Sequence, residues 1–204
     1  RSSAASDVYK RQVLEACRKA ACKRFIFSSS GGTVYGEQKA FPASEEHPTA
    51  PISPYGVSKL AGEGYLQFYR FQYGLETVIL RYANVYGPRQ DPHGEAGVVS
   101  IFSKLLLAGE PITINGDGEQ TRDYVFVEDV ARANLNALAC EATGPINIGT
   151  GRETSVNALA GLVQDITGST APVRRAAQKP GEQKRSVLAC KRAESVLDWK
   201  PQFT

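Results

Sequence analysis

The sequence has no methionine, only four cysteines, two histidines and one tryptophan among its 204 residues. The cysteines, at positions 17, 22, 140 and 190, show no C-x-x-C pairing, which favours reduced thiols over disulfides, and no metal site is expected. No apolar run approaches the roughly 18 residues of a membrane span. The segment from Arg1 to Gln12 lacks the apolar core of a secretory signal. These absences favour a cytoplasmic protein, and the absent start residue predicts that the chain is part of a longer protein.

The composition is that of a globular protein, with 42% hydrophobic and 22% charged residues. These fractions exclude disordered, collagen-like and coiled-coil proteins, and the length suits one domain or part of a larger one. The net charge is +3, but the segment 172–192 holds seven basic residues against Glu182 alone. Such a patch is consistent with an anionic small ligand or with a solvated basic face. Nucleic acid is not expected as a partner, because the segment has no interleaved aromatic residues for base stacking.

Strands and helices alternate along the chain, which indicates an α/β fold with a mainly parallel sheet. Strands are expected at 24–27, 77–80, 112–114, 124–127 and 145–148, and helices at 13–22, 54–73, 98–108, 129–142, 155–167 and 192–197. The proline-containing segment 37–53 and the aromatic segment 81–88 are expected to be loops. Ser53 and Asp129 are predicted to cap the helices that follow them, and Gly74 is predicted to end the first of these helices.

Polar side chains follow three of the expected strands, at 28–30, 82–84 and 149–151. Ligands of a parallel sheet bind beyond the carboxyl ends of its strands. Tyr55 and Lys59 are four positions apart in a predicted helix, so we expect them to share a face. Tyr35 and Lys39 have the same spacing, but they fall in a predicted loop where their side chains need not meet. By itself, the Tyr55–Lys59 spacing is equally consistent with a half-buried aromatic residue at a helix start.

Four ordered motifs identify the chain with a known family. They are Phe27-Ser28-Ser29-Ser30-Gly31-Gly32-Thr33-Val34-Tyr35-Gly36, Ser53-Pro54-Tyr55-Gly56-Val57-Ser58-Lys59, Leu80-Arg81-Tyr82-Ala83-Asn84-Val85-Tyr86-Gly87-Pro88-Arg89 and Arg122-Asp123-Tyr124-Val125-Phe126-Val127-Glu128-Asp129-Val130. Together they resemble extended short-chain dehydrogenase/reductases of the NAD-dependent epimerase/dehydratase family. The resemblance spans residues 12–203 and is greatest to the members that epimerise a UDP-hexose at C4.

The resemblance implies a partial Rossmann-type, doubly wound parallel sheet with a smaller C-terminal substrate-binding region. Residues 12–90 would form the C-terminal part of the NAD-binding domain, to which the chain returns near 124–150. Residues 91–204 would mainly bind the nucleotide sugar, whereas residues 1–11 do not resemble the family and are expected to be foreign to it. The family's glycine-rich turn and acidic ribose-binding residue are not found in this sequence. We therefore expect this chain by itself to bind NAD weakly and to be inactive, whereas the complete enzyme would be a homodimer.

The resemblance also implies roles for individual residues. Tyr55 would be the base acting on the sugar 4-hydroxyl, Ser30 would bind the reacting oxygen, and Lys59 would hold the nicotinamide ribose. The expected cofactor is NAD, and the positions that match its contacts are Ser28, Tyr55, Lys59 and Tyr82. The expected substrate is a UDP-sugar, and the positions that match its contacts are Thr33, Asn84, Val98, Val99, Arg122, Lys179, Glu182 and Ser186. Because Ser186 is small where a tyrosine would exclude N-acetyl groups, UDP-N-acetylhexosamines are also expected as substrates.

Two alternatives to an epimerase remain open. Family members that remove water or carbon dioxide place acidic residues after the serine run, whereas Ser30-Gly31-Gly32-Thr33 holds none. Dehydration is therefore disfavoured, although a dehydratase, a decarboxylase or another nucleotide-sugar oxidoreductase stays an alternative. A non-catalytic relative that binds a nucleotide cofactor is the second alternative. The intact set of Ser30, Tyr55 and Lys59 favours an enzyme.

Overall fold

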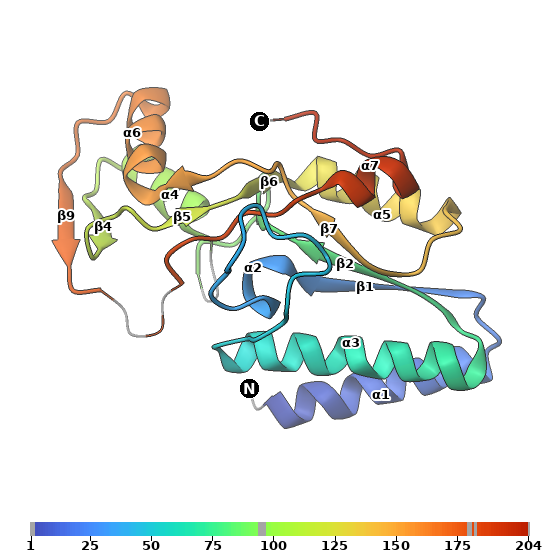
Figure 1. Ribbon diagram of the computed structural model, residues 1–204. Coiled ribbons are helices and arrows are strands. Elements are labelled where there is room, and N and C mark those ends of the chain that lie inside the picture. Colours follow the sequence, from blue (N-terminus) through green and yellow to red (C-terminus); the bar gives the residue numbers. More distant parts are fainter. Residues whose placement is uncertain (1–2, 94–96, 179–180, 182, 204) are drawn as a thin grey trace.

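A parallel three-stranded sheet forms the centre of the molecule. The structure, a computed structural model, describes residues 3–93, 97–178, 181 and 183–203. The sheet has the order β1 (Arg24–Ser30), β2 (Glu76–Tyr82) and β7 (Gly144–Ile148). Helices α1 (Ser3–Lys19) and α3 (Pro54–Tyr73) cover one face, and α5 (Val127–Ala139) and α7 (Lys191–Leu197) cover the other (Figure 1). The predicted α/β architecture with a parallel sheet is therefore confirmed.

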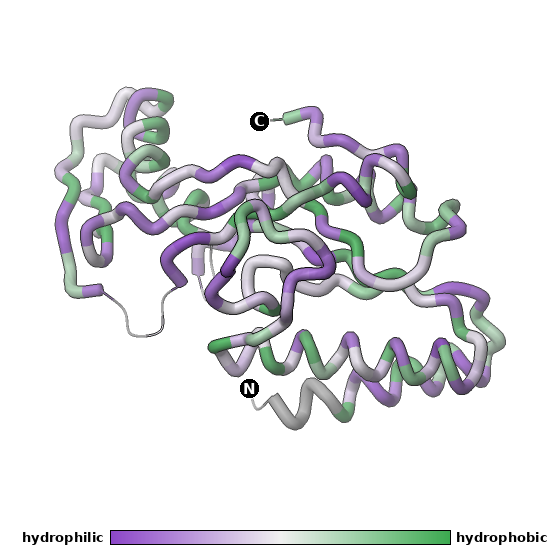
Figure 2. Tube along the Cα trace, viewed as in Figure 1, coloured by the Kyte–Doolittle hydropathy of each residue, from purple (hydrophilic) through white to green (hydrophobic). Residues whose placement is uncertain are grey.

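Each face of the sheet has its own apolar cluster, because side chains of a strand alternate between the two faces. The face under α1 and α3 buries Ile79 against Leu14 and Leu66. The face under α5 buries Leu80 and Ile146 with residues of that helix. Along α3 and the coloured part of α1, hydrophobic and hydrophilic residues are interspersed as expected for amphipathic helices (Figure 2). Within the described residues, no helix combines the length and the hydropathy needed to cross a bilayer.

A smaller second lobe lies beyond one end of the sheet, on the left of Figure 1. It contains α4 (Val98–Leu107), α6 (Val156–Thr167) and the parallel pair of β4 (Ile112–Asn115) and β9 (Val173–Ala176). The two helices and β4 share an apolar cluster that is separate from those of the sheet. Two short pairs lie between the lobes: β3 (Asn84–Tyr86) with β6 (Tyr124–Phe126), and β5 (Thr121–Arg122) with β8 (Thr154–Ser155).

Local capping signals placed several helices correctly. Helix α3 spans Pro54–Tyr73 as predicted, with the Ser53 hydroxyl accepting a hydrogen bond from the Gly56 amide at 3.1 Å. Gly74 ends the helix with a left-handed φ of 69°. Helix α1 was predicted wrongly, because it begins at Ser3 rather than at residue 13.

Asp129 does not cap α5, in contrast to the prediction. Phe126 occupies the N-cap position, while the buried Asp129 carboxylate accepts hydrogen bonds from the backbone amides of Gln202 and Phe203. It also pairs with Arg132 at 2.7 Å. Asp129 therefore anchors the segment that follows α7.

Several predicted boundaries near the strands were also wrong. Strand β1 continues through Ser30 instead of ending at residue 27, and the short helix α2 (Gly31–Val34) follows it directly. Residues 84–86, expected in a loop, form β3 because β6 supplies a pairing partner. Helix α5 ends at Ala139, three residues before the predicted end.

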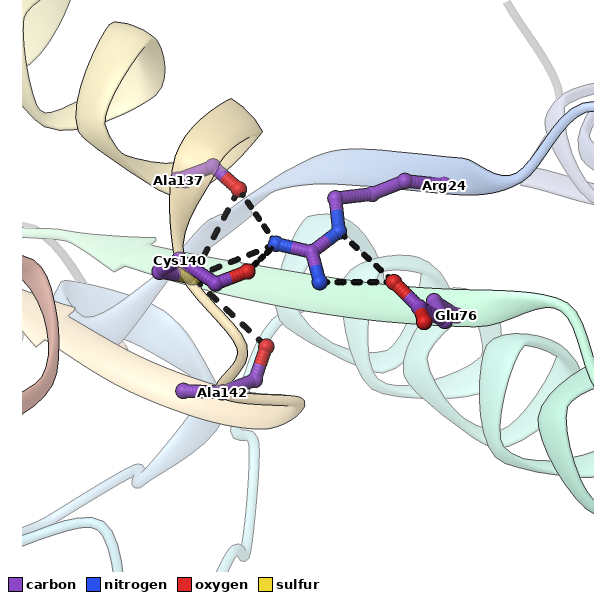
Figure 3. A network of polar contacts seen from close by, with 5 residues as sticks. All are labelled: Arg24, Glu76, Ala137, Cys140 and Ala142. Atoms are coloured by element: carbon purple, nitrogen blue, oxygen red, sulfur yellow. Dashed lines mark hydrogen bonds and ion pairs between the residues drawn. The ribbon is translucent and has the colours of Figure 1, made fainter.

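Arg24 joins three elements at the amino end of the sheet (Figure 3). Its guanidinium donates to Glu76 Oε2 at 2.6 Å and 3.0 Å, which ties the start of β1 to the start of β2. It also donates to the carbonyl oxygens of Ala137, at 3.0 Å, and Cys140. Carbonyls in the last turn of a helix have no intrahelical donor. Arg24 therefore caps α5 at the amino end of the sheet, opposite the carboxyl ends of its strands.

Candidate functional site

A cavity of about 540 Å³ opens at the carboxyl ends of β1 and β2, and we call it the strand-end cavity. Six of the predicted site residues line it: Ser30, Thr33, Tyr55, Tyr82, Asn84 and Arg122. They come from β1, α2, α3, β2, β3 and β5 respectively. The structure therefore brings together residues that are up to 92 positions apart in the sequence.

A second cavity of about 450 Å³, the adjoining cavity, shares Asn84, Gly97 and Arg122 with the first. Val98 lines it as well, whereas Val99 packs against the apolar cluster of the second lobe. Both cavities meet at Gly97, the N-cap residue of α4. Amides in the first turn of a helix lack intrahelical acceptors and favour anions. The junction of the cavities is therefore suited to a negatively charged group.

Tyr55 and Lys59 share a face of α3, as their spacing predicted. The Lys59 ammonium lies 5.4 Å from the centroid of the Tyr55 ring and donates a 2.7 Å hydrogen bond to the Ser28 carbonyl oxygen. Burial lowers the pKa of Lys59, and the positive charge of Lys10 lowers it further. The Tyr55 side chain is 48% exposed, so its ring is accessible at the cavity wall.

Ser30 and Tyr82 are register partners on β1 and β2, and both line the strand-end cavity. The Tyr82 hydroxyl lies 3.1 Å from Ser28 Oγ and 3.0 Å from Asn134 Oδ1 of α5. The structure therefore groups Ser28, Tyr82 and the ammonium of Lys59 at the end of β1. This set of hydroxyls and one ammonium suits a ligand with several hydroxyl groups.

Arg122 carries the one charge among the described residues that line the two cavities. Its Nη1 atom donates to the Thr121 carbonyl oxygen at 2.7 Å, which orients the guanidinium at the shared wall. The backbone of the neighbouring Asn84 is held by a 2.9 Å hydrogen bond from its N–H group to the Asp123 carbonyl oxygen. With one cation and no carboxylate in their described walls, the cavities are suited to an anionic ligand.

Two of the predicted substrate contacts that the structure describes, Val99 and Ser186, do not appear in the cavity walls. Ser186 is only 2% exposed and lines neither cavity. Its hydroxyl would lie 3.8 Å from a Cβ added to Gly32, a residue that lines the strand-end cavity. Lys179 and Glu182 lie outside the described residues.

The competing Tyr35–Lys39 pair does not form a site. Tyr35 is fully buried at the end of α2, and its hydroxyl donates to Asn147 Oδ1 at 2.8 Å. Lys39 belongs to the following loop, where its backbone amide donates to His47. Of the two tyrosines with this spacing, only Tyr55 lines the strand-end cavity.

The described cations of the basic segment 172–192 do not line either cavity. Arg185 pairs with Glu153 at 2.6 Å, and Arg175 and Arg192 donate to backbone carbonyl oxygens. These contacts agree with the interpretation of a solvated basic face.

Two glutamines line the strand-end cavity although no sequence motif indicates them. The amide of Gln90 donates to the Val85 carbonyl oxygen at 3.1 Å, and that of Gln183 donates to the Gly36 carbonyl oxygen. Glutamine is common on protein surfaces, so neither position stood out. Gln183 reaches the site only because the segment 183–189 crosses beside loop 36–43, which a linear pattern does not reveal.

Comparisons with known proteins agree with this geometry. Residues 7–149 match the sequence profile of the NAD dependent epimerase/dehydratase family. A putative UDP-glucose 4-epimerase of Methanocaldococcus jannaschii is 50% identical over 191 residues, covering 94% of this chain and 62% of that relative. The UDP-glucose 4-epimerase of Mycolicibacterium smegmatis is 47% identical, covering 94% of this chain and 61% of that relative.

Solved structures give the same result for the fold. The UDP-glucose 4-epimerase of Thermotoga maritima, crystallised with UDP-glucose, superposes with a TM-score of 0.94 at 48% identity, over 96% of this chain and 63% of that one. The Thermus thermophilus enzyme, a complex with NAD, superposes with a TM-score of 0.90 at 42% identity, over 96% of this chain and 64% of that one. The chain thus spans less than two thirds of the length of each of these relatives.

Proposed function

The chain belongs to the NAD-dependent epimerase/dehydratase family, and on that premise we propose that it carries the catalytic residues of a UDP-hexose 4-epimerase. The reaction would interconvert UDP-glucose and UDP-galactose through a 4-keto intermediate. The observation that supports this proposal most strongly is the convergence of Ser30, Tyr55 and Arg122 on one cavity. The two curated relatives described above carry the name of this activity, one of them as putative.

Tyr55 would act as the base and then as the acid of the reaction. Its phenolate takes the proton from the sugar 4-hydroxyl when C4 is oxidised and returns a proton to that oxygen when C4 is reduced. Ser30, on the neighbouring strand end, donates a hydrogen bond to the same oxygen. The Lys59 ammonium, 5.4 Å from the Tyr55 ring centroid, favours the phenolate by its positive charge. When bound, NAD supplies the hydride acceptor and donor for C4.

The residues at the end of β1 fit the nicotinamide end of that cofactor. Ser28, Lys59 and Tyr82 offer two hydroxyls and an ammonium within one hydrogen-bonded group. Ribose hydroxyls and a carboxamide need such donors and acceptors. These residues would hold the cofactor beside Tyr55 and thereby fix which face of the sugar C4 atom it meets.

The two cavities would divide the substrate between them. The hexose would occupy the strand-end cavity beside Thr33 and Asn84, and the nucleoside would occupy the adjoining cavity. The diphosphate would then lie at their junction, where Arg122 and the first turn of α4 supply positive potential. Val98, at the start of α4, would contribute a backbone amide.

The described residues that line the two cavities disfavour a dehydratase and a non-catalytic relative. Removal of water needs a carboxyl group near the sugar as acid or base, and the described lining residues include no Asp or Glu. A non-catalytic nucleotide-binding relative would not need a tyrosine at the mouth of the sugar cavity beside a lysine. Epimerisation requires one proton-transfer residue, and Tyr55 meets that requirement.

The proposal extends to the setting of the complete protein, which we expect to be a cytoplasmic homodimer without a membrane or nucleic-acid partner. The four unbridged cysteines are consistent with a reducing compartment. Light scattering of the protein expressed from its complete coding sequence would measure its mass in solution.

An assay of that same protein tests the proposed function. With NAD present, UDP-glucose and UDP-galactose should convert into the same mixture from either starting sugar. Mass spectrometry of the products distinguishes the alternatives, since a dehydratase product lacks one water and a decarboxylase product lacks carbon dioxide. Unchanged substrate from both directions, with native protein and bound UDP, would instead indicate the non-catalytic relative.

A further inference from the structure

A buried ion pair lies directly behind the strand-end cavity. Glu63 of α3 and Arg81 of β2 face each other with 2.6 Å between Oε2 and Nη2, and their side chains are 2% and 6% exposed. A second hydrogen bond, from Arg81 Nε to Glu63 Oε1 at 3.1 Å, makes the contact bidentate. Neither residue lines the cavity, so the proposed reaction does not use this pair directly.

The same carboxylate also holds β1. The Ser29 hydroxyl donates to Glu63 Oε1 at 2.5 Å, and Ser29 is the register partner of Arg81 in the sheet. Ser29 immediately precedes Ser30, whose side chain lines the cavity. One carboxylate of α3 therefore binds both strands at the level of the proposed catalytic serine.

The contacts continue across the sheet to β7. Arg81 Nη1 donates to the Tyr35 hydroxyl at 3.0 Å, and that hydroxyl donates to Asn147 Oδ1 at 2.8 Å. Burial alone would lower the pKa of the Arg81 guanidinium, but its contacts with Glu63 and Tyr35 raise it above the ordinary value. Arg81 therefore stays charged in its buried position.

Glu63 lies on the same side of α3 as the catalytic pair, four residues after Lys59 and eight after Tyr55. Because a helix is stiff along its axis, a sliding movement at Glu63 would move Tyr55 by about the same distance. The apolar contacts of α3, such as Leu66 on Ile79, resist separation from the sheet but are not directional. The bidentate contact of Glu63 with Arg81 is directional and permits one axial position of the helix.

We propose that Glu63 and Arg81 are positioning residues that set where α3 lies along β1, and so how Tyr55 meets the oxygen bound by Ser30. This inference rests on the proposed function for its kinetic readout. Replacing a buried ion pair by apolar residues of similar volume is often neutral or stabilising. The pair is therefore better explained by the geometry it imposes than by the stability it provides.

A double variant separates geometry from stability. In Glu63→Leu/Arg81→Met the buried charges are removed together, so we expect a melting temperature close to that of the wild type. The kcat for the epimerisation should nevertheless fall by about 100-fold, as expected for a reacting group displaced by about 1 Å. The KM for UDP-glucose should change by less than about threefold, because nucleotide contacts in the adjoining cavity are unaffected. Glu63→Gln, which keeps the side-chain shape, should lower kcat by about tenfold and serves if the double variant fails to fold.

Hydrogen exchange gives a second readout that needs neither substrate nor turnover. Backbone amides of residues 56–60, in the first turns of α3, should exchange about tenfold faster in the variants than in the wild type. Amides of α5, on the other face of the sheet, should exchange as before. This measurement tests the positioning of α3 even if the protein has no epimerase activity, so a failure of the proposed function is distinguishable from a failure of this inference.

Asp129→Asn is the matched control, because Asp129 is the other buried carboxylate with an ion-pair partner among the described residues. Its side chain is 0% exposed, its partner Arg132 is 28% exposed, and Asp129 lines neither cavity. It should lower the melting temperature and leave kcat per folded molecule unchanged. Wild-type kcat in a folded double variant or in Glu63→Gln would overturn the inference. Unchanged hydrogen exchange in the first turns of α3 would overturn it as well. A loss of kcat in Asp129→Asn equal to that in Glu63→Gln would also overturn it, because the loss would then follow from reduced stability and not from the position of α3.

Discussion

The Lys59 ammonium lies 5.4 Å from the centroid of the Tyr55 ring, one helical turn away on α3. The same ammonium donates to the carbonyl oxygen of Ser28 on β1. A single side chain thus connects the helix that carries the proposed base with the strand that carries Ser30. The charge that favours the phenolate is fixed by backbone and helix rather than by another flexible side chain.

Replacing Tyr55 with phenylalanine should abolish turnover, by at least about 100-fold in kcat, because the ring keeps its packing and loses only the proton-transfer group. Thermal unfolding should be almost unchanged, since the side chain is 48% exposed. The matched control is Tyr73→Phe, at the other end of α3 and equally exposed, which should keep full activity. More than a few per cent of wild-type activity in Tyr55→Phe would contradict general-base catalysis by Tyr55.

Local signals explain why much of the fold and the shared helix face of Tyr55 and Lys59 could be predicted. A capping serine, a proline at the first position and a terminal glycine defined α3 to the residue, because all three act within one helical turn. The spacing of Tyr55 and Lys59 then placed both on one face. The strand-end position of Ser30 followed from the alternation of strands and helices.

Long-range contacts explain what could not be predicted. The backbone amides that donate to Asp129 lie more than 70 residues away, so its anchoring role has no local pattern in the sequence, where its position instead predicts a cap. Gln183 and Ser186 depend on how the segment 183–189 crosses beside loop 36–43, which brings Gln183 into the cavity wall and buries Ser186. The Glu63–Arg81 pair joins a helix and a strand whose contact exists only in the folded chain.

Arg122→Lys should weaken the binding of UDP by about tenfold, because lysine keeps the charge but cannot form the two parallel hydrogen bonds that a phosphate receives from arginine. Titration calorimetry with UDP measures this loss without turnover. Arg174→Lys, on the exposed strand β9, is the control and should bind UDP as the wild type does. Equal affinity in all three proteins would show that Arg122 does not contact the diphosphate.

Gly36→Ala should destabilise the protein by about 3 kcal/mol or more, as judged by urea unfolding. Gly36 has a left-handed φ of 63°, and an added Cβ would overlap the carbonyl oxygen of Ala50 in the loop that precedes α3. Gly74→Ala separates the two causes, because Gly74 has a φ of 69° with nothing within 4 Å of the added atom. It should cost only about 1 kcal/mol. Similar losses in both variants would mean that the loop at Ala50 yields to the new methyl group.

Tyr124 predicts a specific loss of stability at alkaline pH. Its hydroxyl is buried without a hydrogen-bond partner among the described residues, and burial raises its pKa from 10.0 to about 12 against an opposing effect of the Arg122 charge. Between these two values the unfolded chain releases the phenol proton while the folded chain retains it. The free energy of unfolding should therefore fall as the pH rises through this window, by about 3 kcal/mol for a shift of two units.

Urea unfolding of the wild type and Tyr124→Phe, at about pH 9 and about pH 12, isolates this contribution, because the other titrating groups cancel in the difference. The phenylalanine variant should lack that part of the alkaline loss. At neutral pH it should be at least as stable as the wild type, since removing a buried hydroxyl that has no partner among the described residues relieves its desolvation. Tyr124 also lines the adjoining cavity. If both proteins lost the same free energy between the two pH values, the Tyr124 hydroxyl would be hydrated in the folded state, and the interior of the adjoining cavity would be open to water.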